Sequence, residues 1–368
     1  TKGNLNFIQI KKIFKVFNIN TKSVKDVNGS IDLKTKSSFV LTKNLKIKDL
    51  LYLIDGNIEN LEISTSSNKL LKEYFPEYNS KLVFNNTIIK LQKYQKSQSL
   101  EVNGSAKINQ NYDNFEIKQS FDSNKKTFSI NGLINLTNSK IKIPQLNYKK
   151  KKGIETKVNF DINFAPQKYY NITTIDLLSG ETYIKLNNVK LNKDFEVIDF
   201  VNIKVKTLNE KIKNNDFLVS KKKNIVVKGE IFDAEPLLKS LYKKNNKQLL
   251  SKNFSSDIKI NFNKTLTGTD DDLFNLSMIA SLKKGKYNKL ILKGDFSKNE
   301  IVEMSIYQVD QNKQTLQVIS DRARPFIKNF DFIKGFEGGK LEYESISSNQ
   351  ASNSSLSITD FKVSEVPS

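Results

Sequence analysis

Residues 154–164 read IETKVNFDINF, and this stretch decides the fold class. Apolar side chains and Thr156 occupy every second position, and charged or amide side chains occupy the positions between them. Successive side chains of an extended strand point to opposite faces, so this period of two predicts a strand with one dry and one wet face. FSSDIKINF (254–262), TIIKLQKY (87–94) and VNIKVKTL (201–208) show the same period. Turn dipeptides recur about every ten residues, which predicts an antiparallel meander.

A glycine motif recurs within these predicted strands. It consists of an apolar residue, Asn or Lys, Gly, any residue, and then Ala, Ile or Phe. A glycine inside a strand marks a bulge, a bend or a close approach of two backbones, so the copies predict strands that bend at equivalent places. Chance recurrence of a short, degenerate pattern is the alternative. The copies are VNGSI (27–31), VNGSA (102–106), INGLI (130–134), VKGEI (227–231) and LKGDF (292–296).

Two short helices interrupt the strand pattern. AEPLLKSL (234–241) and ARPFIKNF (323–330) share one pattern and lie 89 residues apart. Proline suits the first turn of a helix, and the spacing of the apolar residues gives each helix an apolar face. Asp233 and Asp321 precede the two copies at positions that predict N-terminal caps. We expect helices at about 233–243 and 321–331, each covering an edge or end of the sheet.

Arg322 and Arg324 flank the alanine of the second copy and are the only arginines in the chain. Two cations fit poorly with the dipole at a helix N-terminus, which favours simple exposure to solvent. The alternative is that both contact a carboxylate or a lipid phosphate at the end of the sheet. They are therefore the candidates for contact with a lipid headgroup.

Charge and composition exclude several classes of function. The chain has 60 basic and 39 acidic residues, a formal net charge of +21. Arginine, the preferred residue for base edges and bidentate phosphate contacts, is nearly absent, and the lysine run 149–152 is predicted to be a turn before Gly153. We expect no nucleic-acid partner. The lack of Cys and His removes thiolate chemistry, the usual catalytic triads and the commonest metal ligand, so we predict no catalytic residue, metal or cofactor.

The acidic cluster TDDDLF (269–274) is the remaining feature that could suggest an enzyme or a calcium loop. It follows Gly268, where a turn is expected, and Leu273 and Phe274 interrupt the spacing that a calcium loop needs. Paired-carboxylate hydrolysis is the enzymatic alternative that this cluster leaves open. We expect the chain not to be an enzyme.

The C-terminal segment resembles a known family. Ser320, Asp321 and Ala323 are followed by Phe330 and Phe332, by Gly338, Gly339, Lys340 and Leu341, and by the strand residues Leu356, Ile358, Asp360, Phe361 and Val363, with Pro367 after them. This order is similar to the C-terminal signature of the AsmA-like superfamily, and FDAEPLL (232–238) is similar to an earlier helix of that family. The specific match covers 320–368 and 231–241, so we divide the chain into 1–230, a β-meander or groove segment, and 231–368, an AsmA-like segment that continues the same sheet.

This resemblance implies a fold and a function. It implies an elongated, twisted antiparallel β-sheet curled into a groove, and a non-enzymatic protein that carries phospholipid between the inner and outer membranes of a Gram-negative bacterium. It also implies a periplasmic location, with phospholipid, the two membranes and other envelope proteins as partners. No apolar run in the sequence approaches the roughly 20 residues of a membrane-spanning helix, so the inner-membrane anchor that the resemblance implies would lie outside this sequence. The chain is then a fragment of a longer protein.

A groove of this kind requires an apolar track for acyl chains, because exposing them to water costs about 0.8 kcal/mol per CH₂. The alternation assigns the dry side of two predicted strands to that track. Equally, these faces could close on each other in a sandwich, which would suit a structural or adhesive β-repeat protein without lipid. The candidate lining residues are Ile154, Val158, Phe160, Ile162, Phe164, Phe254, Ile258, Ile260 and Phe262.

Overall fold

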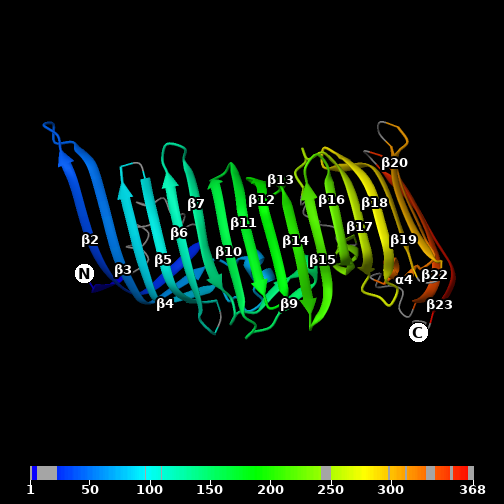
Figure 1. Cartoon of the computed structure of the whole chain (residues 1–368), viewed down its shortest axis with the longest axis horizontal. Coiled ribbons are helices and arrows are strands. Elements are labelled where there is room, and N and C mark those ends of the chain that lie inside the picture. Colours follow the sequence, from blue (N-terminus) through cyan, green and yellow to red (C-terminus); the bar gives the residue numbers. More distant parts are fainter. Residues whose placement is uncertain are drawn as a thin grey trace. The chain divides into compact units, whose positions relative to one another are not determined.

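The structure is a computed structural model (Figure 1). The chain forms two compact units. The first unit comprises Thr1–Pro144 and Lys149–Leu186, and the second comprises Gln145–Tyr148 and Asn187–Ser368. Strands dominate both units and the helices are few and short, so the predicted all-β class is confirmed. The described residues are 2–5, 23–95, 97–108, 110–241, 250–296, 299–310, 313–328, 336–348 and 351–363.

The sheet of the first unit is an antiparallel meander in which each strand pairs with the next one along the chain, apart from one excursion. That excursion joins β7 to β10 and forms a small second sheet of β8 (Ile141–Ile143) and β9 (Tyr148–Lys150), linked by the 3-10 helix η1 (Pro144–Leu146). Helix α2 (Lys69–Tyr74) lies between β3 and β4 in sequence and packs against β8. The main strands are, in order, β1 (Lys2–Leu5), β2 (Val24–Leu41), β3 (Ile47–Thr65), β4 (Lys81–Tyr94), β5 (Ser97–Lys107), β6 (Asp113–Asp122), β7 (Thr127–Asn135), β10 (Thr156–Ala165) and β11 (Tyr169–Ser179).

The second unit is also rich in strands, and one pair of its described strands is parallel. β16 and β17 run parallel, because the chain passes through helix α3 (Glu235–Leu241) between them. Strand β12 (Thr182–Asn192) contains the residues at which the division between the units falls. The strands of this unit are β13 (Val197–Asp199), β14 (Asn202–Asn209), β15 (Ile212–Lys221), β16 (Ile225–Asp233), β17 (Ser256–Leu266), β18 (Leu273–Lys283), β19 (Lys286–Asp295), β20 (Ile301–Gln308), β21 (Gln314–Ser320), β22 (Phe336–Ser347) and β23 (Ser352–Val363).

The glycines of the recurring motif lie beside irregularities in the ladders. Register shifts occur next to Gly29, Gly104, Gly229 and Gly294, whereas the ladders on both sides of Gly132 are regular. An ideal Cβ on Gly104 would lie 2.2 Å from the Oγ1 atom of Thr87, in the bulged part of β4. Gly29, Gly104 and Gly229 therefore permit close approach of the neighbouring strand at a bulge, which is one of the roles that the sequence predicted.

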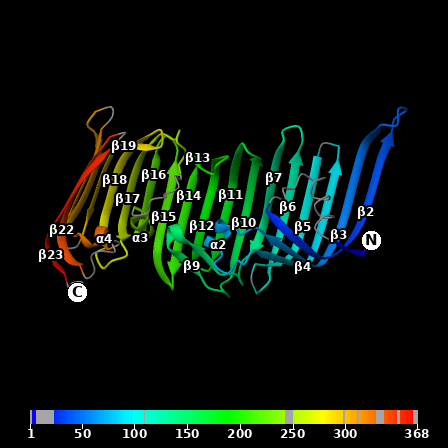
Figure 2. The ribbon, with the colours of Figure 1, turned by 180° about the vertical axis from the view of Figure 1, so that it is seen from behind.

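The repeated proline motif forms two helices with related anchoring. Helix α3 follows β16, and helix α4 (Arg324–Ile327) follows β21. The strands β16 and β21 run in the same direction, so the two helices lie at the same end of their strands (Figure 2). Ala234 and Ala323 are both buried, and the backbone N–H of each donates to a neighbouring strand, to Leu266 O (2.9 Å) and Gly339 O (2.7 Å) respectively. A small residue is required at both positions because the chain passes so close to that strand.

Three local expectations are revised by the structure. Asp233 caps α3 through a bond from the Glu235 N–H (3.1 Å), but Asp321 does not cap α4, because its Oδ2 atom accepts the Ile301 N–H (2.9 Å). α3 begins at Glu235 and α4 begins at Arg324, later than the expected starts at 233 and 321. The expected ends, 242–243 and 329–331, lie outside the described residues. The lysine run 149–152 is half strand, since Lys150 belongs to β9. The two compact units divide near residue 186. The expected boundary at 230, which follows the family resemblance, stays a prediction.

Candidate functional site

An apolar lattice covers one face of β6, β7, β10 and β11 in the first unit. Its first row consists of Phe121, Phe128, Phe164 and Tyr170, which lie directly opposite one another in the three ladders. The rings of this row are stacked or tilted against each other, with centroids 4.6, 5.2 and 5.7 Å apart. Parallel rows follow along the strands. The second row is Gln119, Ile130, Ile162 and Ile172, the third is Ile117, Gly132, Phe160 and Ile175, and the fourth is Phe115, Ile134, Val158 and Leu177.

Burial changes along this lattice from one end of the strands to the other. Phe115 and Thr156, near the excursion that carries β8 and β9, are fully buried. Phe160, Ile162 and Phe164 are only half-buried, and so are the other members of the first two rows. The first and second rows, called the upper rows below, therefore consist of half-buried and mostly apolar side chains.

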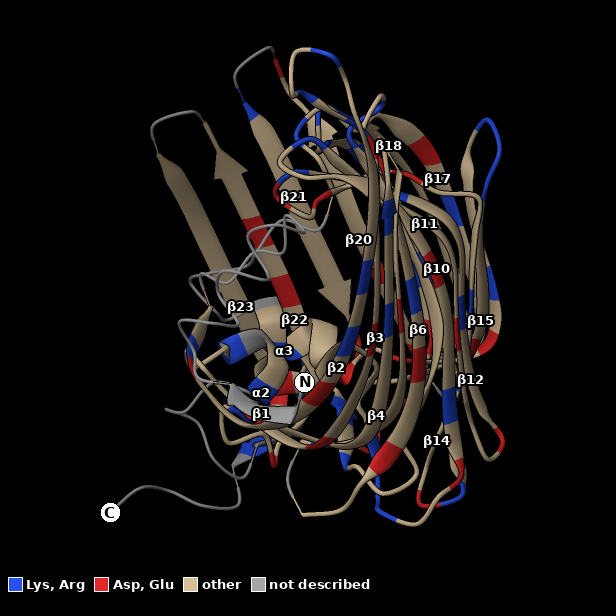
Figure 3. Cartoon of the chain, turned by 90° about the vertical axis from the view of Figure 1, so that its left-hand side faces the viewer, with Lys and Arg blue, Asp and Glu red and all other residues tan. Residues whose placement is uncertain are grey.

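The opposite face of the same strands is mostly polar, with Leu133 and Leu178 as exposed apolar exceptions. Glu116, Lys118, Asn131, Lys157 and Asn159 alternate with the lattice residues and are exposed. In Figure 3, blue and red bands of charged residues interrupt strands such as β3 and β6. The predicted wet and dry faces of this segment are therefore the ones observed, with the dry face lying on one continuous side of the sheet.

The candidate lining residues fall into three environments. Val158, Phe160, Ile162 and Phe164 form one column of the lattice on β10. Ile154 does not belong to that column, because the strand begins at Thr156 and Ile154 is exposed beside Gly153, whose φ of +82° makes a turn. In the second unit Phe254 precedes β17. Ile258, Ile260 and Phe262 form a column on β17, in which only Ile260 is not fully buried.

The β17 column belongs to a packed core. Phe262 stacks on Phe232 (centroids 5.0 Å apart, planes at 17°) and meets Phe217 edge-on (5.9 Å, 89°). Gly229 lies opposite Phe217 and Phe262, and an ideal Cβ there would approach the Cε1 atom of Phe262 to 2.8 Å. The second unit thus uses its dry face for packing, which leaves the β10 column as the candidate lipid-binding surface.

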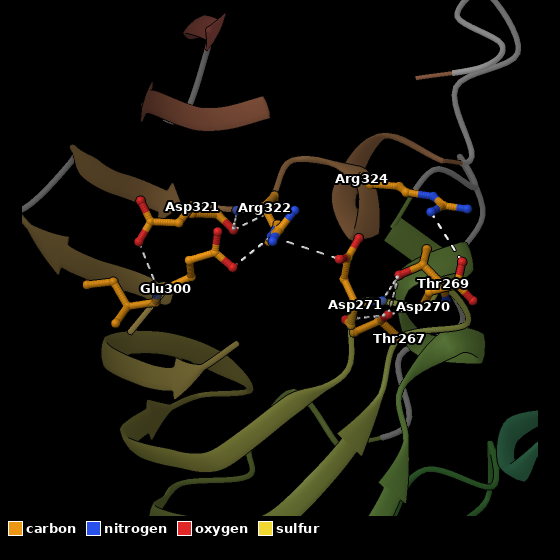
Figure 4. A network of polar contacts seen from close by, with 10 residues as sticks. Thr267, Thr269, Asp270, Asp271, Glu300, Asp321, Arg322 and Arg324 are labelled. Atoms are coloured by element: carbon orange, nitrogen blue, oxygen red, sulfur yellow. Dashed lines mark hydrogen bonds and ion pairs between the residues drawn. The ribbon is translucent and has the colours of Figure 1, made fainter. Parts of the chain in front are cut away.

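Arg322 and Arg324 contact carboxylates, so the favoured expectation of simple solvent exposure is wrong (Figure 4). The Nε atom of Arg322 lies 2.8 Å from Glu300 Oε2 and 4.0 Å from Asp271 Oδ1, and the Nη1 atom of Arg324 lies 3.3 Å from Asp270 Oδ2. These pairs tie the start of α4 to the turns that precede β18 and β20. A lipid phosphate would have to compete with Glu300 for Arg322.

The acidic cluster is located in the predicted turn, between β17 and β18. Each of its three aspartates has a different cationic partner, because Asp272 pairs with Lys264 (2.9 Å) while the other two face the arginines. The Thr267 hydroxyl donates to the Asp271 carbonyl (3.0 Å) and braces the turn. Within the part of the chain that the structure describes, no group of three His, Cys, Asp or Glu side chains is arranged to hold a metal ion.

A buried polar network in the second unit has no counterpart in the sequence predictions. The Nδ2 atom of Asn215 donates to Leu146 O and to Thr207 Oγ1 (both 2.9 Å), and its Oδ1 atom accepts the Asp233 N–H (3.0 Å). The Nδ2 atom of Asn214 donates to Asp233 Oδ2 (3.1 Å). Because these buried groups satisfy one another, the network fixes the segment that leads into α3.

Lys150 is the buried cation that the sequence predictions missed. Its ammonium donates to the carbonyl oxygens of Leu136, Thr137 and Ser139. Removal from water lowers the pKa of Lys150 from its ordinary value of 10.5 to about 8, an effect that the negative charge of Asp113 partly offsets. The side chain therefore joins β9 to the segment that follows β7, so that the excursion between β7 and β10 is closed on itself.

The comparisons with known proteins add no relative. No protein-family model, curated protein or solved structure matches the chain. Among the described helices, none combines the length and apolar character that crossing a bilayer would require.

Proposed function

We propose that the chain is a non-enzymatic lipid-binding protein, in which the apolar lattice of the first unit holds phospholipid acyl chains for transfer within a cell envelope. The observation that carries this proposal is that the side chains of the upper rows of the lattice are only half-buried. These are the row from Phe121 to Tyr170 and the row from Gln119 to Ile172. An isolated apolar surface of this kind is costly in water, and its coverage by an acyl chain returns about 0.8 kcal/mol per CH₂.

The geometry suits a chain-like, sequence-independent ligand. The lattice repeats along the strands without a polar group that would fix one orientation, apart from Gln119 at its border. A sliding hydrocarbon chain needs area and continuity, whereas a small-molecule site usually adds a few convergent polar groups. The resemblance of 320–368 to the AsmA-like superfamily supports the envelope setting, the periplasmic location and phospholipid as the cargo.

The test is the lipid content of the purified chain. The protein is prepared without detergent and extracted with organic solvent, and phospholipid is quantified by mass spectrometry against protein. We expect phospholipid in stoichiometric amount with the unaltered chain. We expect Phe160→Asp to lose it, because the substitution places a charge in the third row of the lattice.

Asn159→Asp is the matched control, since it adds the same charge to the exposed face of the same strand. It should retain the lipid content of the unaltered chain. Circular dichroism of both variants separates the alternatives. A folded Phe160→Asp chain with full lipid content contradicts the proposal, and so does a lipid-free unaltered chain. Global unfolding of Phe160→Asp indicates that the lattice is the closed core of a structural or adhesive protein.

A further inference from the structure

The turn between β2 and β3 is an exposed apolar tip. These are two long strands, of 18 and 19 residues, and in Figures 1 and 2 their turn extends beyond the neighbouring turn between β4 and β5. The turn is closed by the Thr42 N–H bonding to Lys46 O and by the Leu45 N–H bonding to Thr42 O, both 2.9 Å. The Thr42 hydroxyl also accepts the Lys46 N–H (3.1 Å). The tip is therefore an ordered three-residue hairpin loop.

Leu45 occupies a position in this loop at which leucine is unfavourable. Its φ of +56° is in the left-handed region, where glycine or asparagine is preferred in loops of this type. The turn from Phe296 to Glu300 has its left-handed position, φ +61°, filled by Asn299. The Leu45 side chain is 81% exposed, so it makes little packing contact in return for its unfavourable backbone conformation.

Further large apolar side chains surround Leu45 on both sides of the hairpin. Leu41 lies opposite Ile47, and Val40 lies opposite Lys48 on the other face. Phe39, Val40, Leu41 and Ile47 are each about half exposed, at 49–56%. Single exposed apolar residues are ordinary on protein surfaces, but a cluster at the end of one projecting hairpin indicates an interaction site.

The charges at this tip are of one sign. Residues 33–48 include five lysines and no acidic residue, and Lys43, Lys46 and Lys48 alternate with the apolar side chains of the tip. Asp49, the next residue, accepts a bond from Gln95 Nε2 (2.8 Å) towards the body of the sheet. Apolar side chains that enter the acyl region and lysines that remain among the headgroups match a bilayer containing anionic lipid.

We propose that the β2–β3 turn is a membrane-contacting tip that inserts Leu45 into the surface of a bilayer containing anionic phospholipid. A membrane fits better than a folded partner, because the apolar side chains point to both faces of the hairpin and line no concave surface. The inference stands apart from the acyl-chain lattice, since a chain could touch a membrane without extracting lipid and could hold lipid without this tip.

The chain contains no tryptophan, so Leu45→Trp places a single tryptophan reporter at the tip. The variant is mixed with vesicles of phosphatidylglycerol and phosphatidylcholine, and with vesicles of phosphatidylcholine alone. On the anionic vesicles we expect a blue shift of emission and quenching by brominated acyl chains. Leu45→Asn, which suits the left-handed position, should keep the fold and lower vesicle partitioning about tenfold. Lys43→Gln and Lys46→Gln should each lower binding to anionic vesicles about fivefold at low salt.

Phe195 provides the matched control. Its turn has the same hydrogen bonds, from Asn192 N to Glu196 O (2.9 Å) and from Phe195 N to Asn192 O (3.1 Å), and its φ is +63°. Its side chain is 64% exposed, but Asp194 and Glu196 flank it. Phe195→Trp should show neither blue shift nor quenching. Four outcomes would overturn the proposal. The chain could fail to bind anionic vesicles, or the emission of Leu45→Trp could remain that of a water-exposed tryptophan on bound chains. The responses at positions 45 and 195 could be equal, or the chain could show a self-association that Leu45→Asn abolishes. Lipid co-purified with the chain is measured separately and tests only the lattice.

Discussion

Phe128 and Phe164 face each other across β7 and β10, with ring centroids 5.2 Å apart and ring planes at 13°. Each also stacks outward, Phe128 on Phe121 and Phe164 on Tyr170, so this pair is the centre of a four-ring row. The four rings pack against one another along one edge of the lattice, although each of them is only half-buried. The same side chains thus contribute to folding and offer an apolar surface.

A double-mutant cycle measures the first of these contributions. Phe128→Ala and Phe164→Ala should each destabilise the chain, and the double variant should lose less than the sum of the two. The difference should be about 0.5–1.5 kcal/mol, the usual coupling of a contacting aromatic pair beyond its buried area. Urea unfolding followed by circular dichroism supplies the three values. Strict additivity would mean that the rings contribute only through independent burial.

Gly229→Ala tests whether the recurring glycine is required by close packing. An added Cβ would lie 2.5 Å from Phe217 Cβ and 2.6 Å from the carbonyl oxygen of Asp216, both closer than real contacts allow. We expect a loss of about 1–3 kcal/mol in the free energy of unfolding, as for other overpacked sites. Gly153→Ala is the comparison, because nothing lies within 4 Å of its Cβ position and only its φ of +82° is unfavourable. A larger loss at Gly153 than at Gly229 would contradict the packing account.

Arg322 and Arg324 should differ in their contribution to stability. Arg322 is one-third exposed, and its partner Glu300 is similarly shielded, whereas Asp270, the partner of Arg324, is almost fully exposed. We expect Arg322→Gln to cost about 1 kcal/mol and Arg324→Gln less than about 0.5 kcal/mol, because exposed ion pairs contribute little. Guanidinium would screen these charges, so urea is the denaturant of choice. Loss of bound phospholipid in Arg322→Gln, with stability unchanged, would favour the headgroup role instead.

Local patterns predicted those features that the backbone itself determines. The period of two in residues 156–164 is a direct consequence of strand geometry, so the column from Val158 to Phe164 could be read without knowing its neighbours. Four of the five motif glycines could likewise be placed beside bulges, and Gly132, with regular ladders on both sides, is the exception. Ile154 was assigned to the wrong environment because the alternation continues by chance through the turn at Gly153.

The remaining features depend on which strands become neighbours. The rings opposite Phe164 come from β7 and β11, and only the register of two hairpins brings Phe128 and Tyr170 to it. The parallel pairing of β16 and β17 depends on a crossover through α3, which no periodicity encodes. The arginines lie beside acidic turns that are distant in sequence, so their pairing could be raised only as an alternative. Burial of Lys150 similarly depends on the path of the excursion between β7 and β10.

Lys150 makes the stability of the chain depend on pH in a definite direction. Its pKa is lowered to about 8 in the folded state, chiefly by burial, and is taken as the ordinary 10.5 in the unfolded state. Below pH 8 both states carry the proton, and the folded state bears the cost of a buried charge. Between about pH 8 and 10.5 the unfolded state binds more protons, so the free energy of unfolding should rise with pH over this range and then level off.

The contribution of Lys150 is isolated by comparison with variants. Lys150→Met removes the titrating group and should abolish the excess slope between pH 8 and 10, measured by urea unfolding at half-unit steps. It should also be less stable near pH 7 if the bonds to Leu136, Thr137 and Ser139 outweigh the cost of burial. Lys149→Met, at the exposed neighbouring position, should leave the slope unchanged. An identical pH dependence in the unaltered chain and Lys150→Met would show that the ammonium remains hydrated in the folded state.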